Sequence, residues 1–161
     1  MLLLWLTGLG AVALLAGLAW YLAPLQPGVV ALQLAFTPHS FGRIVHGWPA
    51  EHLQRYLTHL PVDGLLLLSY GAFGYLLATR TALFARYALP VQRIARWLLP
   101  LAALFDAVEN LFHAWLASAP RFGVPWAYAL SATSASLKWL LLLAFAGLTS
   151  LALARIGHTG T

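Results

Sequence analysis

The sequence predicts an all-α integral membrane protein, a four-transmembrane-helix bundle with a short amphipathic interfacial segment in the first extracytoplasmic loop. Apolar residues make up 61% of the 161 residues and charged residues only 8%, whereas an ordinary soluble domain is about 25% charged. Four apolar stretches reach the roughly 20 residues that a helix needs to cross a bilayer core. Most Arg residues lie near the ends of these stretches. The length fits a single integral membrane domain over residues 1–161.

The four predicted transmembrane helices cover residues 2–22, 62–79, 97–117 and 128–154. We interpret the first as a retained helix, because residues 1–6 carry no side-chain charge of the kind that opens a signal peptide. Trp20 and Tyr21 at its end resemble an interfacial aromatic anchor. The fourth is longer than the core requires, so we expect it to tilt or to emerge from the core.

The loop between the first two predicted helices is too long for a simple turn. Thr37 can cap a helix whose first residue is Pro38, and Pro49 and Pro61 suggest the limits of a second segment. Its predicted apolar face consists of Leu53, Tyr56, Leu57 and Leu60. Residues 38–60 are therefore expected either to lie on the outer membrane surface as an amphipathic segment or to cap the bundle.

The Arg residues predict the orientation in the membrane. Four of them (Arg80, Arg86, Arg93 and Arg96) lie between the second and third predicted helices, and Arg155 follows the fourth. Short cation-rich loops stay in the cytoplasm. We therefore expect a multi-pass protein of the bacterial inner membrane with both termini cytoplasmic. Because topology accounts for the cations, they do not indicate nucleic-acid binding.

The stretch "LFDAVENLFH" places polar residues inside the third predicted helix. At about 100° per residue, Asp106, Glu109, Asn110 and His113 fall within an arc of about 100°. Alanines lie on or near the same face and would let another helix approach closely, so this face is expected to point into the bundle.

Polar residues of two other helices are expected to meet this face. Lys138, the only Lys in the chain, should lie nearly level with Glu109 in the outer half of the bundle. Asp63 and Tyr70 are seven residues apart on the second helix. The predicted polar site is lined by Asp63, Tyr70, Asp106, Glu109, Asn110, His113, Ser134 and Lys138.

Several roles for this site stay open. It could bind a lipid-like amphipathic molecule, with Lys138 and His113 at the polar head and the apolar bundle around the tail. It could instead be a buried ion pair and hydrogen-bond network that only fixes helix packing in a structural or accessory subunit. In an enzyme acting on a lipid, the general acid/base candidates are Asp106, Glu109 and His113. A proton-coupled carrier is a further alternative, and a single four-helix chain would need to dimerise to make its path. Besides the lipid bilayer, the expected partners are a second copy in a homo-oligomer or a partner membrane subunit.

The sequence predicts no metal and no cofactor. Glu109 and His113 have an i, i+4 spacing that can chelate, but no second Glu-x-x-His motif completes a di-iron site. The pairs His39–His46 and His52–His59 are each about 10 Å apart along a helix, too far to share one ion, so we expect solvated or interfacial side chains. The absence of Cys excludes disulfides and thiol-ligated metals. Familiar nucleophile and phosphate motifs are also missing.

Four short motifs resemble a group of small, uncharacterised bacterial four-helix integral membrane proteins. They are "LAFTP" (34–38), "VDGLLLLSYG" (62–71), "DAVEN" (106–110) and "LKW" (137–139), and they follow one another over most of the chain. The resemblance implies the fold and a shared polar site, and it implies no catalytic role. By analogy only, sterol-isomerase-like membrane bundles also place acids and an Asn in a lipid-facing cavity.

Overall fold

A computed structural model describes residues 1–119 and 121–157, which form helices and no strands. The all-α prediction is confirmed. The four long helices are α1 (Leu2–Leu22), α4 (Ala50–Arg80), α5 (Leu89–Ser118) and α6 (Pro125–Gly157), and two short helices, α2 (Val29–Gln33) and α3 (Pro38–Gly47), lie between α1 and α4.

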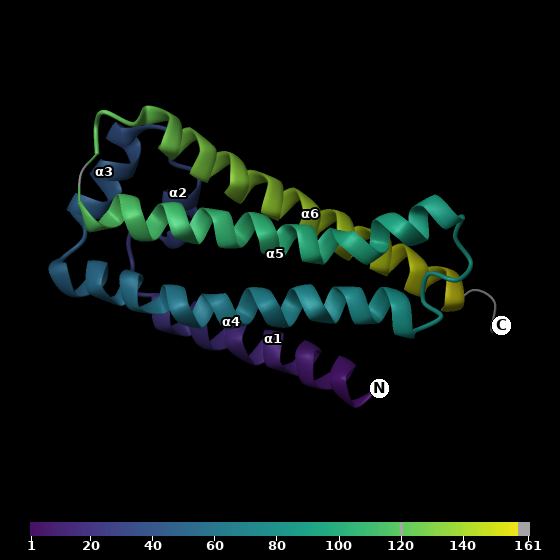
Figure 1. Ribbon diagram of the computed structural model, residues 1–161. Helices are drawn as coiled ribbons and strands as arrows, with labels where there is room; N and C mark the ends of the chain where they lie inside the picture. Colours follow the sequence, from purple (N-terminus) through teal and green to yellow (C-terminus); the bar gives the residue numbers. More distant parts are fainter. Residues whose placement is uncertain (120, 158–161) are drawn as a thin grey trace.

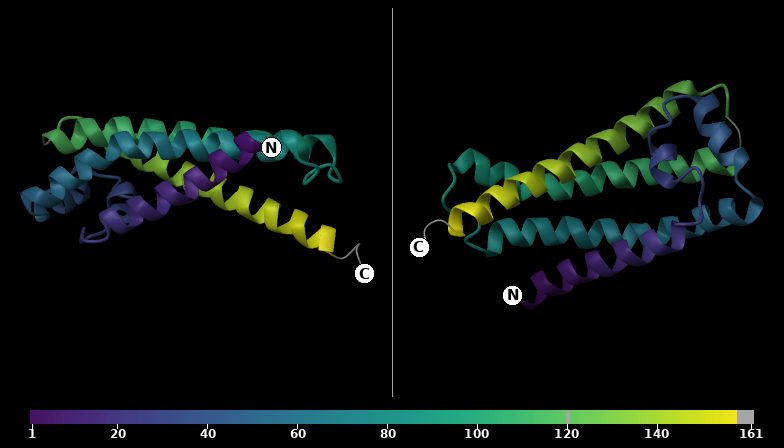
Figure 2. Two further views of the ribbon diagram at one scale, coloured as in Figure 1. Left: turned by 90° about the horizontal axis from the view of Figure 1, so that it is seen from below. Right: turned by 180° about the vertical axis from the view of Figure 1, so that it is seen from behind.

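The long helices pack side by side in the order α1, α4, α5, α6 (Figure 1). The first residue of α1, the loop 81–88 and the last turns of α6 share one end of the molecule, and α2 and α3 occupy the other (Figure 1). From below, α1 and α6 slant in opposite directions across the α4–α5 pair (Figure 2). The outer helices α1 and α6 therefore flank a central pair.

Three long helices are apolar enough to cross a membrane: Leu2–Leu22, Ala50–Arg80 and Pro125–Arg155. Only 11–17% of the residues in their most apolar stretches are buried within the protein. Large side chains such as Leu9, Val12 and Trp20 on α1 are more than half exposed. Continuous exposed apolar surface of this kind marks contact with a membrane or a partner. The composition and this surface together indicate a membrane protein.

The predicted helix boundary at Pro61 is wrong. α4 begins at Ala50 and continues through Pro61 to Arg80. The first turns of α4 lie at an angle to the rest of the helix (Figure 2), which is the usual response to a proline that lacks the N–H of the helical ladder. The predicted interfacial segment thus splits into α3 and the first turns of α4.

The start of α3 agrees with the sequence prediction. Thr37 is the N-cap, and its hydroxyl oxygen accepts a hydrogen bond of 3.1 Å from the Ser40 backbone N–H. The Ser40 hydroxyl in turn accepts from the Thr37 N–H at 3.2 Å. This reciprocal capping, with Pro38 in the first turn, stabilises a helix of only 10 residues.

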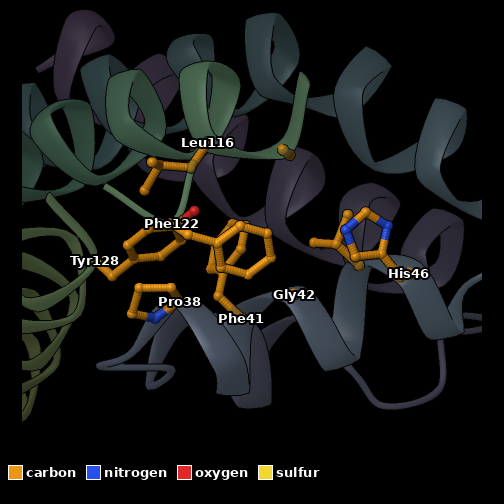
Figure 3. Close-up of a pocket in the computed structure, with 9 residues that line it drawn as sticks. Pro38, Phe41, Gly42, His46, Leu116, Phe122 and Tyr128 are labelled. Carbon is orange, nitrogen blue, oxygen red and sulfur yellow. The ribbon is translucent and has the colours of Figure 1, made fainter. Parts of the chain in front are cut away.

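α2 and α3 cover one end of the bundle. Leu32 and Phe41 are buried in a cluster with Trp48, Leu116 and Tyr128. Side chains from α3, α5 and α6 meet there, and the Phe41 ring packs edge-on to the Tyr128 ring (Figure 3). The cavity left between them holds only about 10 Å³, too little for a ligand. Of the two alternatives for residues 38–60, the packing favours the cap.

Two glycines let α4 approach α5 closely. A Cβ added at Gly71 would lie 3.1 Å from the Ala103 Cβ, and one at Gly74 would overlap the Leu99 side chain. Small residues at such positions are the common device for packing helices tightly in membranes. The close approach brings the polar residues of α4 within reach of those on α5.

Candidate functional site

A buried ionic cluster joins α5 to α6. The Lys138 Nζ donates hydrogen bonds to the Asp106 Oδ1 at 3.0 Å and to the Glu109 Oε2 at 2.6 Å. All three residues are buried, Glu109 completely. The cation between the two carboxylates lowers the cost of burying these charges, each of which would be costly alone. We call Asp106, Glu109 and Lys138 the ionic cluster.

Among the described residues, two hydrogen bonds to carboxylates connect α4 to α5. The Tyr70 hydroxyl donates to the Asp106 Oδ2 at 3.0 Å, so both oxygens of that carboxylate accept a hydrogen bond. The Asn110 Nδ2 donates to the Asp63 Oδ2 at 2.6 Å. Asp63 forms no ion pair with any cation in the part of the chain that the structure describes. Its one hydrogen-bond partner among the described residues is thus a neutral amide.

A third group of polar side chains lies toward the capped end. The Glu109 Oε1 has no hydrogen-bond partner among the described residues and lies 3.7 Å from the His113 Nδ1. That nitrogen is 2.5 Å from the Tyr56 hydroxyl. The His59 Nδ1 hydrogen-bonds to the Tyr56 backbone oxygen. His113 and Tyr56 are almost completely buried, so these contacts are closed to solvent.

The structure brings most of the predicted site residues together. Asp106, Glu109 and His113 share the buried face of α5, as their spacing requires, and Lys138 reaches the first two from α6. Ser134 is buried one turn before Lys138, but it has no described hydrogen bond to the ionic cluster. Asp63 and Asn110 form a separate pair beside it.

Two adjoining cavities, which we call the groove, lie between α1 and α6. The larger holds about 640 Å³, and its lining comes from α1, Gln33, α4, α5 and α6. The smaller holds about 360 Å³ and extends toward α2 and the first turns of α4. Both are lined by Leu15, Gln33, Asp63, Leu66 and Trp139.

The groove is polar near the capped end and apolar elsewhere. The polar residues that line the larger cavity are Gln33, Asp63, Tyr70, Asp106 and Lys138. The remaining lining includes Leu9, Val12, Phe73, Leu142 and Phe145. Of the predicted site residues, Glu109, His113 and Ser134 line neither cavity. The groove is therefore amphipathic, and the ionic cluster closes one side of it.

Sequence reasoning missed four residues of this region. The Trp139 Nε1 donates to the Gln33 Oε1 at 3.1 Å, a contact between α6 and the unpredicted helix α2. Tyr56 and His59 are buried and line the smaller cavity, so the expectation of a solvated or interfacial His59 is wrong. A signal for Tyr56 was present, because it precedes Asp63 by seven residues, as Asp63 precedes Tyr70. Reading the helix through Pro61 would have placed them on one face.

Within residues 1–119 and 121–157, no group of three or more His, Cys, Asp or Glu side chains is arranged to hold a metal ion. Comparison with protein-family models, curated proteins and solved structures finds no match to this chain. The functional argument therefore depends on the chemistry and geometry of the site itself.

Proposed function

We propose that this chain is an integral membrane protein that binds a lipid-like amphipathic molecule in the groove between α1 and α6. The observation that carries the proposal is the shape and polarity of the groove. The volume of its larger cavity, about 640 Å³, lies within the roughly 300–1,000 Å³ of small-molecule sites. A polar end and long apolar walls match a molecule with a head and a tail.

The proposal includes four membrane spans, with α5 as the fourth. Polar residues lower the hydropathy of α5, but Asp106, Glu109 and His113 are buried against neighbouring helices. Its exposed side chains include Leu104 and Leu111, which suit contact with lipid. At about 1.5 Å per residue its 30 residues reach about 45 Å, enough to cross a bilayer.

The proposed orientation places both ends of the chain and the loop 81–88 in the cytoplasm of a bacterial cell. Arg80, Arg86 and Arg155 lie at that end of the helices, which supports the orientation by the positive-inside rule. Since the chain has no Cys, single Cys variants can test it cleanly. Phe122→Cys in intact cells should react with a membrane-impermeant maleimide, and Ala85→Cys should react only after lysis. The reverse result would overturn the orientation.

Ligand entry from the bilayer follows from the walls of the groove. Leu9 and Val12 line the larger cavity and are more than 60% exposed, so they contact both the groove and the surrounding medium. In a membrane that medium is the acyl region, which is where the apolar part of an amphipathic ligand partitions. The head would meet Asp63, Tyr70 and Asp106 instead of the His113 expected from the sequence, since His113 does not line the groove.

Native mass spectrometry of gently purified protein tests the proposal. A discrete lipid adduct should copurify with the wild type and disappear in Val12→Trp, which places a large ring in the groove. Leu6→Trp is the matched control, since Leu6 is a comparably exposed α1 residue that does not line the cavity. The same adduct on all three proteins, or on none, would overturn the proposal.

One contact favours acid/base catalysis as a second candidate function. Tyr70 and Asp106 both line the larger cavity and are hydrogen-bonded to each other, so a carboxylate and a phenol face any bound molecule. Such a pair can move protons in a lipid isomerisation. If the groove is an active site, Asp106→Asn should retain the lipid adduct while abolishing its conversion.

A further inference from the structure

We infer that the groove selects a long-chain amphiphile whose head is a protonated amine. The inference depends on the proposed function and deepens it, because it names the chemistry of the ligand at the same site. It is carried by the imbalance of charge and of hydrogen-bonding groups along the groove.

Asp63 supplies the negative charge. It lines both cavities at their junction and is only partly buried, so its carboxylate is accessible from the groove. The Asn110 amide occupies the Oδ2 but carries no charge, and no hydrogen bond is described at the Oδ1. A carboxylate with a free oxygen in a mostly apolar groove favours a cationic donor.

The Lys that lines the groove is not available to bind an acidic head. Among the described residues, Lys138 is the only Lys or Arg that lines the groove, and it already contacts Asp106 and Glu109. Counting Asp63, three acids thus accompany one Lys in this region, although Glu109 itself lines neither cavity, and the surplus is negative. A fatty acid or phosphate head would have to separate this cluster or lie beside its carboxylates, and both cost free energy.

The smaller cavity contributes hydrogen-bond acceptors, which favour a donor in the same way as the surplus of negative charge. Because the Tyr56 carbonyl can only accept, its bond to His59 places the hydrogen on the Nδ1, and the Nε2 of a neutral imidazole is then an acceptor. Asn110 donates to Asp63 through its Nδ2, which leaves its carbonyl oxygen to accept. A protonated primary amine offers three donors and no acceptor, and it fits this set.

The walls suit the rest of such a molecule. Trp139 lines both cavities, and its ring already lies near a cation, because the Lys138 Nζ is 5.5 Å from the ring centroid. From Asp63 the larger cavity continues between Trp5, Val12, Phe73 and Phe145, which offer contact for an alkyl chain. The junction at Asp63 would therefore hold the amine, and the larger cavity would hold the tail.

The test compares three probes with the same chain: tetradecylamine, tetradecanol and tetradecanoate. Apparent Kd values are measured by native mass spectrometry on delipidated full-length protein. We expect the amine to bind about tenfold more tightly than the alcohol, and the carboxylate to bind most weakly. Asp63→Asn should remove the preference for the amine, whereas Asp63→Glu should keep it. Glu51→Gln is the matched control, because the Glu51 side chain is 83% exposed and lines neither cavity.

The outcomes separate the inference from the proposed function. Amine preference in the wild type, in Asp63→Glu and in Glu51→Gln, with none in Asp63→Asn, supports both. If the three probes bind equally, or the carboxylate binds best, and Val12→Trp still blocks binding, the amine inference is overturned while the groove remains a lipid site. Binding that is unaffected by Val12→Trp overturns both. Helix content and gel-filtration profile are measured for each variant, and Asp63→Glu provides the charge-retaining comparison should Asp63→Asn fold poorly.

Discussion

The ionic cluster and the Asp63–Asn110 pair lie side by side but differ in how completely their charges are satisfied. In the ionic cluster, Lys138 lies between two carboxylates and the Tyr70 hydroxyl donates to a third one of their four oxygens, so that only the Glu109 Oε1 has no hydrogen-bond partner among the described residues. Asp63, in contrast, has one amide partner and lies at the junction of the two cavities. The difference suggests a division of roles: the ionic cluster holds α5 to α6, and Asp63 is available to a ligand.

The largest effect should come from breaking the ionic cluster. Lys138→Met leaves two buried carboxylates facing each other without a cation, which should lower the free energy of unfolding by about 3–5 kcal/mol. Reversible denaturation in detergent measures this loss. The triple variant Asp106→Asn, Glu109→Gln, Lys138→Met should recover at least half of it, because no charge is then buried. A triple variant as unstable as the single one would mean that the charges themselves are needed.

Stability should be next most sensitive to the close contact between α4 and α5 at Gly74. Gly74→Ala places a Cβ against Leu99, and overpacking of this kind should cost about 2 kcal/mol. Gly64→Ala in the same helix is the matched control, since nothing lies within 4 Å of its added Cβ. If the two variants are equally stable in thermal unfolding, close packing does not hold α4 to α5. The Asp63–Asn110 hydrogen bond must then contribute more to the stability of the α4–α5 contact than we infer.

Tyr56 should show a smaller effect on stability. Tyr56→Phe removes the hydroxyl that contacts the His113 Nδ1 and leaves a buried ring nitrogen without this partner, a loss of about 1.5 kcal/mol. Tyr75→Phe, at a ring that is 40% exposed, should change thermal stability by only a few tenths of a kcal/mol. Equal losses would show that the buried hydroxyl is not a stabilising contact between α4 and α5.

The ionic cluster could be predicted from the sequence because helical periodicity alone determines which residues share a face. Asp106, Glu109 and His113 repeat at spacings of three and four, and a single Lys at a matching depth on α6 leaves few alternative partners. The first helix was equally predictable, and its predicted range, 2–22, is that of α1. An uninterrupted apolar run of this length in a membrane protein predicts a transmembrane helix.

The sequence was insufficient where tertiary contacts override local signals. Pro61 suggests a helix end, but packing of α4 against α1 and α5 carries the helix through it, so Tyr56 and His59 enter the site unexpectedly. Gln33 lies in a five-residue helix with no periodic pattern to detect. The groove itself depends on the angle between α1 and α6, which no local pattern encodes.

Asp63 should matter least to stability, and this prediction tests the comparison most directly. The new amide carbonyl of Asp63→Asn can still accept the Asn110 hydrogen bond, and Asp63 forms no ion pair with the described residues, so the free energy of unfolding should change by less than about 1 kcal/mol. The measurement is the same detergent denaturation used for Lys138→Met. A loss close to that of Lys138→Met would place Asp63 in the structural network and remove the basis for assigning it to a ligand. Little loss of stability, together with altered amine binding, would assign different roles to Asp63 and to the carboxylates of the ionic cluster. The carboxylates of the ionic cluster would pair with Lys138 of the protein, and Asp63 would pair with the amine of a ligand.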